Sequence, residues 1–331
     1  MNVNDKRRRA GSGIFLGIGI SLVLIVGLAA AAPASRFQLE LYGGIAQPGL
    51  SDLNSLASYD SAVQEFFYDR LFDFQRQAGL IDGWNKTLTG SRGPIGHAFP
   101  LGLRIRWRLS EPIAVSLGLR LSYARRESDY SFAYTRDDLD GYECRETVAY
   151  RPYLLSSKAL AVLAGVHFAK PIYRKWTLEA FLAAGPVFVD CEHASSWEYT
   201  WHRRGTGEDW DVFQMTGLLE EKGRGTGIAA DLGARLQRPL GKRLALFLEG
   251  AYAYQAVKTI RGKGREIRGD VATEWEGTWA FKTETITAPW GSLTTEFPTN
   301  YWPEGSASSR SRGFRLDASG FQARLGVSFL F

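Results

Sequence analysis

The sequence predicts an all-β fold: a closed, antiparallel, up-and-down transmembrane β-barrel of about eight strands, with long extracellular loops and a helix in the first loop. Three observations support this prediction. Eight stretches of roughly ten residues alternate apolar and polar residues, and a tilted strand of that length can cross a bilayer. Short and long connections alternate strictly, which places every long loop at one end. The face opposite the apolar one carries charged and small residues, as the interior of a membrane barrel does.

The first element is an export signal. Lys6–Arg9 form a basic cluster, residues 13–32 are almost wholly apolar, and Ala32-Pro33-Ala34 places small residues in an A-x-A arrangement. This order is typical of a secretory signal peptide, so residues 1–34 are predicted to be removed by cleavage near Ala34. The apolar run is also long enough for an uncleaved membrane anchor, and either interpretation takes the chain out of the cytoplasm. The mature barrel is predicted over residues 35–331.

The predicted strands share one pattern, in which apolar residues at every second position point one way and polar or small residues point the other way. The pattern is clearest in the second strand, where Leu103 and Ile105 share one face and Arg104 and Arg106 share the other. The strands are predicted at residues 36–46, 99–109, 113–124, 159–168, 176–189, 228–237, 244–255 and 321–331.

The connections between these strands fall into two classes. Short connections are predicted at residues 110–112, 170–175 and 238–241. Long connections, predicted to be extracellular, cover residues 47–97, 126–157, 190–226 and 256–313. Membrane barrels have this asymmetry, with short turns on one side of the bilayer and long loops on the other.

The polar face of the strands carries charges of both signs. They are Glu40, Arg104, Arg106, Arg120, Glu179, Asp231, Arg235, Glu249 and Arg324. An unpaired charge inside a narrow lumen costs several kcal/mol, so these residues are predicted to form ion pairs across the lumen. Side chains can fill a barrel of this size, so we expect no open diffusion pore, although a narrow channel stays an alternative. On a soluble sheet the wide apolar faces would lack a cover.

The C-terminal strand ends in a distinctive pattern, with Leu325, Val327, Phe329 and Phe331 at alternate positions. This pattern resembles the C-terminal insertion signal of bacterial outer-membrane proteins. Together with the opening Leu39–Gly44, the mature chain resembles the small eight-stranded barrels of the OmpA/OmpX/opacity-protein type. The resemblance covers the strands and not the loops. It implies a Gram-negative outer membrane, contact with its lipid and lipopolysaccharide, and delivery by the barrel-assembly machinery.

The first long loop contains a helix signal. Ser51 and Asp52 are predicted to cap its N-terminus. Apolar residues follow at helical spacing, namely Leu53, Leu56, Tyr59, Val63, Phe66, Phe67, Leu71 and Phe74. Two interpretations are open: the helix packs over the barrel mouth, or it lies on the membrane surface or binds a partner.

Aromatic residues recur in the later loops. Trp197, Tyr199 and Trp201 alternate in the third loop, and Trp275 and Trp279 lie in the fourth. Residues two apart share a face of an extended segment, so these loops are predicted to continue the barrel as hairpins above the membrane. Their aromatic side chains would form the core of an ordered cap, bind an extracellular glycan or protein, or do both.

Two cysteines, Cys144 and Cys191, fall in the second and third loops, and a disulfide between them is predicted because the envelope is oxidising. Two cysteines cannot form a four-thiolate zinc site, and His97 and His202 lack companions at metal-ligand spacing. No metal or cofactor is therefore expected. Much of the chain's positive charge lies in the N-terminal signal, so the composition does not favour a nucleic-acid partner.

One short motif suggests catalysis. His193-Ala194-Ser195 resembles the His-x-Ser pair of outer-membrane lipid A deacylases and phospholipases, in which His deprotonates Ser for acyl transfer. Glu198 or Glu208 could orient the histidine. No other part of such a site is evident in the sequence. We therefore expect a non-enzymatic protein that serves envelope structure or surface binding, with a lipid-modifying acyl hydrolase as the alternative.

Overall fold

The computed structural model describes residues 37–90, 95–127, 131–138, 144–204, 210–288, 291–299 and 311–331. The predicted signal peptide lies outside the described residues, and so does Glu208. Among the described residues, no helix has both the length and the apolar character that crossing a membrane requires.

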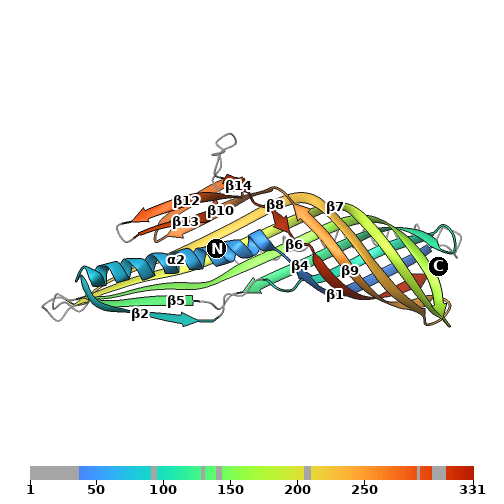
Figure 1. Ribbon diagram of the computed structural model, residues 1–331, viewed down its shortest axis with the longest axis horizontal. Coiled ribbons are helices and arrows are strands. Elements are labelled where there is room, and N and C mark those ends of the chain that lie inside the picture. Colours follow the sequence, from blue (N-terminus) through green and yellow to red (C-terminus); the bar gives the residue numbers. More distant parts are fainter. Residues whose placement is uncertain are drawn as a thin grey trace.

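Eight antiparallel strands form a ring in which each strand pairs with its two neighbours (Figure 1). In order around the ring they are β1 (Phe37–Pro48), β3 (Phe99–Arg108), β4 (Ile113–Glu127), β6 (Cys144–Tyr173), β7 (Trp176–Arg204), β8 (Trp210–Pro239), β9 (Leu244–Val257) and β16 (Gly320–Leu330). The last strand returns to the first, with Leu39 opposite Phe329 and Pro48 opposite Gly320. Each of the eight predicted strands overlaps one of these strands in the predicted chain order.

The segments predicted as long loops consist largely of strands, which confirms the hairpins predicted for the third and fourth loops. β6 and β8 have 30 residues each and β7 has 29, well beyond the ~10 that a bilayer requires. They run outward past the ring at the end opposite the C-terminus (Figure 1). The other elements there are α2 (Ser51–Gln77), β2 (Ile81–Thr89), β5 (Ser131–Asp138), β10 (Ile260–Arg268), β11 (Val271–Thr278), β12 (Ala280–Ala288), β13 (Gly291–Thr299), β14 (Ser311–Gly313) and β15 (Leu316–Asp317). We call these elements, with the outward halves of β6, β7 and β8, the crown.

The two faces of the ring have opposite character. On the outside, Leu101, Leu182, Leu232, Leu248 and Leu325 are between 57% and 63% exposed. On the inside, all nine charged residues that the sequence assigned to the lumen are buried. A soluble barrel would have the reverse distribution.

Three aromatic side chains pack over glycines of a neighbouring strand inside the ring. Tyr42 covers Gly102, Phe181 covers Gly233, and Phe247 covers Gly326. A Cβ atom at any of these glycines would collide with the ring. The glycines therefore make room for aromatic walls in a narrow lumen, and these cross-strand pairs fix the strand register.

Helix α2 lies along the extended strands, between the β2–β5 pair and the β12–β14 sheet (Figure 1). It begins at Ser51, so the capping position is Leu50, and no side chain caps it. Asp52 instead accepts hydrogen bonds from the Arg315 amide at 2.7 Å and from the Arg312 guanidinium at 2.8 Å. The predicted Ser51–Asp52 cap is therefore wrong, because this carboxylate joins the helix to the segment before β16.

The helix packs over the barrel mouth. Leu53 is fully buried, and it belongs to the same apolar cluster as Ala46 and Ala98 at the top of the lumen. Further along, Phe72 is buried against Tyr68 and Trp84, although it is not on the predicted apolar stripe. The side chains at positions 56–67 lie outside the described part of the chain. Of the two interpretations, packing over the mouth is the one these contacts support.

Candidate functional site

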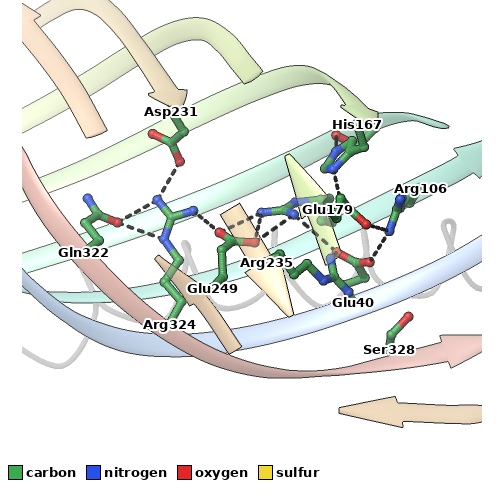
Figure 2. A network of polar contacts seen from close by, with 12 residues as sticks. Glu40, Arg106, His167, Glu179, Asp231, Arg235, Glu249, Gln322, Arg324 and Ser328 are labelled. Carbon is green, nitrogen blue, oxygen red and sulfur yellow. Dashed lines mark hydrogen bonds and ion pairs between the residues drawn. The ribbon is translucent and has the colours of Figure 1, made fainter. Parts of the chain in front are cut away.

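The lumen holds a continuous network of ion pairs, drawn in Figure 2. Nearest the short turns, Arg106 Nη1 lies 2.6 Å from Glu179 Oε2. His167 Nδ1 lies 2.6 Å from the other oxygen of Glu179, and its Nε2 lies 2.8 Å from Ser116 Oγ. This end of the network therefore joins β3, β4, β6 and β7.

In the middle of the lumen, Glu40 and Glu249 link arginines from three strands. Arg235 Nη1 lies 2.8 Å from Glu40 Oε2, and Arg104 Nη1 lies 3.4 Å from the same oxygen. Arg104 also donates to Glu249 at 3.2 Å. Each carboxylate thus faces more than one guanidinium, which offsets part of the cost of burying it.

The outer part of the network is centred on Arg324. Its guanidinium lies 2.6 Å from Glu249 Oε1 and 2.5 Å from Asp231 Oδ2, and it donates to Gln322 Oε1 at 2.7 Å (Figure 2). Asp231 also pairs with Arg120. All nine charged residues assigned to the lumen from the sequence have at least one oppositely charged partner there.

Aromatic rings support this network from the sides. The Arg235 guanidinium carbon lies 3.7 Å from the centroid of the Phe247 ring. Arg104 and Arg324 lie 5.2 Å and 5.3 Å from the centroid of Tyr42. Guanidinium groups at these distances interact favourably with the ring face. The rings that cover the glycines therefore also hold the arginines in place.

Little open space remains along the lumen. A cavity of about 140 Å³, lined in part by Gln38, Arg106 and Glu179, lies at the short-turn end. Outward of the network, a cavity of only about 20 Å³ lies among small side chains that include Ala46, Ala124 and Ala159. That is room for about one water molecule. The cavity at the short-turn end is therefore closed off from the rest of the lumen by the ion pairs.

Above the network, apolar residues close the ring. Three apolar side chains, Leu50 and Leu53 at the start of α2 and Ile95, are buried above the small side chains of Ala46, Ala124 and Ala159. Leu155, Val187 and Val189 continue this cluster into the crown. The lumen is thus blocked twice, first by charged side chains and then by an apolar plug.

The His-x-Ser pair lies on the inner face of the crown. His193 and Ser195 are 2% and 3% exposed, and His193 Nδ1 lies 3.0 Å from Glu221 Oε2. The acid that contacts His193 is therefore Glu221, directly opposite on β8. Glu198, one of the two acids proposed from the sequence, accepts a hydrogen bond from Gln214. Burial on the inner face separates this pair from lipid outside the barrel.

The predicted disulfide is wrong: Cys191 is a free, buried thiol. Cys144 stands opposite Arg203 and Cys191 opposite Ser157 in the β6–β7 register. The twelve positions of β7 from Cys191 to Arg203 span about 40 Å at the usual rise of a strand. The Cα atoms of a disulfide lie within about 7 Å of each other, so these two residues cannot be bridged in this register.

The structure predicts that Cys191 resists alkylation in the folded protein. Burial raises the pKa of the Cys191 thiol to about 12, so at neutral pH it stays protonated, and the thiol is a far weaker nucleophile than the thiolate. In a Cys144→Ser variant, maleimide should label Cys191 only after unfolding. In the wild type, electrophoretic mobility should be the same with and without reductant, because no disulfide joins Cys144 and Cys191. Rapid labelling of the folded variant at pH 7 would contradict this placement.

The crown aromatics fill space between the elements of the crown. Trp279 is 2% exposed and contacts Phe314 edge to face, with ring centroids 5.3 Å apart. Trp197 covers Gly217, and Trp275 covers Gly264 in the same manner. Tyr199 contacts Phe213; the side chain of Trp201 lies outside the described part of the chain. These contacts support the interpretation of an ordered cap.

In the part of the chain that the structure describes, no group of three or more His, Cys, Asp or Glu side chains could hold a metal ion. Three groups outside the predicted site residues also contribute to the lumen and crown. His167 and Tyr42 lie on the polar face of their strands, so the alternation itself points to them. Glu221 could not be identified from the sequence, because its position opposite His193 follows from the β7–β8 register.

Comparisons with known proteins give structural likenesses only. No protein-family model matches this chain, and no curated protein matches it. Among solved structures, the outer membrane protein OprG from Pseudomonas aeruginosa aligns with a TM-score of 0.31 and 8% identity, covering 90% of this chain and 96% of its own. CarO from Acinetobacter baumannii aligns with a TM-score of 0.26 and 13% identity, covering 76% and 98%. At these low scores, the fold of this chain rests on its own strand pairing.

Proposed function

We propose that this protein is an integral outer-membrane β-barrel with a filled lumen, and that its crown serves envelope structure or binds a ligand at the cell surface. The observation that carries the proposal is the inverted distribution of side chains, with an apolar exterior around a buried ion-pair network. Such an exterior is stable in lipid, whereas in water so wide an apolar surface would drive association.

The aromatic residues at the edges of the apolar exterior support this assignment. At the short-turn end, Trp107 is 45% exposed and stacks on Phe37, and Tyr173 is 63% exposed. At the crown end, Tyr254 and Phe188 are also exposed. Girdles of aromatic side chains mark the two membrane interfaces of outer-membrane barrels.

The C-terminal strand fits delivery by the barrel-assembly machinery. Leu325 and Phe329 are exposed on the outer face of β16, and Phe331, directly after the strand, is exposed too, while Val327 is partly buried. An outward apolar pattern would be accessible to an assembly factor before the ring closes. Membership in the OmpA/OmpX/opacity-protein group is part of the same proposal, supported by the eight-stranded ring.

Heat modifiability in the membrane fraction tests the proposal. The full chain is expressed, outer membranes are isolated, and SDS gels are run with and without boiling. We expect a band in the outer-membrane fraction that migrates differently after boiling, since a detergent-resistant barrel keeps its fold in SDS until heated. A soluble periplasmic protein that shows no such shift would overturn the proposal.

Planar-bilayer recording tests the filled lumen. We expect no stable, large conductance from the purified protein, because the ion pairs and the apolar plug both block the path. An eight-stranded barrel of this kind leaves no aqueous channel like that of a 16-stranded porin. A large and persistent conductance would show that the lumen opens, and a narrow channel would then become the leading function.

The acyl-hydrolase alternative is tested at Ser195. We expect no deacylation of lipid A or phospholipid by the purified protein, and hence no loss in Ser195→Ala, because Ser195 is buried on the inner face. Ser156 is also buried, and Ser156→Ala serves as the matched control. Activity in the wild type that Ser195→Ala abolishes and Ser156→Ala retains would establish the enzyme.

A further inference from the structure

A basic surface lies outside the ring where the apolar exterior ends and the crown begins. On β7, Phe188 is exposed, and Asp190 follows two positions outward on the same face. In the β7–β8–β10 register, Asp190 stands beside Arg224 and Arg224 beside Arg261. Two positions correspond to about 7 Å along a strand, so these charges begin directly above the apolar exterior.

The positive charge is concentrated in the row of residues nearest to the apolar surface. That row has Lys158, Arg224, Arg261 and the adjacent Lys258 against one carboxylate, Asp190. The next exposed row outward has two lysines, Lys222 and Lys263, against Glu192 and Glu276. The row after that has Arg265 between Glu220 and Glu274. Net charge therefore changes from positive to negative with distance from the apolar surface.

Part of the first row lines an open groove of about 510 Å³. Its walls combine apolar and cationic groups, with Phe188 and Val189 beside Arg224, Lys258 and Arg261. The Arg224 side chain is 87% exposed, and its Nε lies 2.8 Å from Asp190 Oδ1. That bond engages one of the three guanidinium nitrogens, and the other two carry further donors.

We propose that this groove binds a phosphate group of the outer-leaflet glycolipid lipid A. The inference rests on the proposed function, because it requires the apolar exterior to lie in the outer membrane. A phosphorylated glycolipid matches both parts of the groove: its acyl chains would pack on the exposed apolar side chains near Phe188 and Ile228, and its phosphate would lie at the height of Arg224, Lys258 and Arg261. Guanidinium groups bind phosphate oxygens with paired hydrogen bonds.

The test is a titration of the full-length mature protein in detergent micelles. The probes are fluorescent bisphosphorylated lipid A, the same lipid without its phosphates, and inorganic phosphate as a competitor. We expect Arg224→Ala, Lys258→Ala and Arg261→Ala each to weaken binding of phosphorylated lipid A about fivefold, and the triple variant about a hundredfold. The lipid without phosphates should bind the wild type and the triple variant equally.

Arg265→Ala is the matched control, since Arg265 is exposed on the same strand and face as Arg261 but two rows further out. It should leave binding unchanged. Equal binding of phosphorylated lipid A by the wild type and the triple variant would overturn the inference, as would displacement by millimolar inorganic phosphate as effective as displacement by unlabelled lipid A. The boiling-dependent gel shift is measured on every variant, so failure of the barrel itself would be recognised separately.

Discussion

Replacing Arg324 with alanine is expected to lower the barrel's free energy of unfolding by about 3 kcal/mol. This is the lower end of the range of about 3–5 kcal/mol for removing one partner of a buried ion pair. Arg324 joins Glu249, Asp231 and Gln322 at the centre of the lumen, and its side chain is fully buried. Its removal leaves two buried carboxylates with less compensation, but Asp231 keeps Arg120 and Glu249 keeps Arg104. The free energy of unfolding would be measured by urea titration of the protein in lipid vesicles, followed by tryptophan fluorescence.

The matched control is Arg224→Ala. Arg224 also forms an ion pair, but both partners are largely exposed, and exposed pairs contribute about 0–1 kcal/mol. Arg324→Lys should give an intermediate loss, since it keeps the charge but cannot reach Asp231, Glu249 and Gln322 together with the same planar geometry. An Arg324→Ala variant as stable as Arg224→Ala would show that the network contributes little to the barrel's stability.

The lumen could be predicted from the sequence because a strand has a side-chain period of two. Once Arg104 and Arg106 are placed on one face of β3, the pleat fixes the inner face along the whole strand. The ring then brings inner faces together whatever their separation in sequence, as it does for Arg235 and Glu40. Which arginine meets which carboxylate depends on register and tilt, and alternation alone does not give these.

The crown could not be predicted to the same extent because its strands do not alternate apolar with polar. On β8, the inward positions include Leu219, Glu221 and Gly223, and the outward ones include Leu218, Glu220 and Lys222. Both faces mix apolar and charged residues, so this part of β8 does not itself indicate a strand; the hairpin was predicted from the spacing of Trp197, Tyr199 and Trp201 on β7. On the inner face, the Glu221 carboxylate contacts His193, which stands opposite it on β7.

Long hairpins also explain why the disulfide prediction was wrong and why Glu221 was missed. Within one hairpin, residues pair at equal distances from the turn, so His193 and Glu221 stand opposite each other in the strand register, as Trp201 and Phe213 do. A flexible loop would have let Cys144 approach Cys191. In a hairpin of paired strands, their positions are fixed far apart.

Placing arginine at Leu232 is expected to destabilise the inserted barrel by about 2–4 kcal/mol, the cost of a cation near the bilayer midplane on the lipid face of a barrel. Leu232 is 63% exposed and lies midway along the ring portion of β8, between Ile228 and Leu236. In a soluble barrel the same substitution would change the free energy of unfolding by no more than about 0.5 kcal/mol, because an exposed leucine there would already face water. The measurement is urea unfolding in lipid vesicles, with insertion checked by the boiling-dependent gel shift.

Leu240→Arg is the control that separates membrane depth from exposure. Leu240 is 56% exposed, close to the value for Leu232, but it lies in the short turn after β8, at the membrane edge. The cost there should fall to about 0–1 kcal/mol. Because exposure is nearly equal at the two sites, a difference between the variants reports the surrounding solvent and not the loss of protein contacts. Equal, small effects at both positions would mean that water surrounds the whole barrel, and the outer-membrane proposal would be wrong.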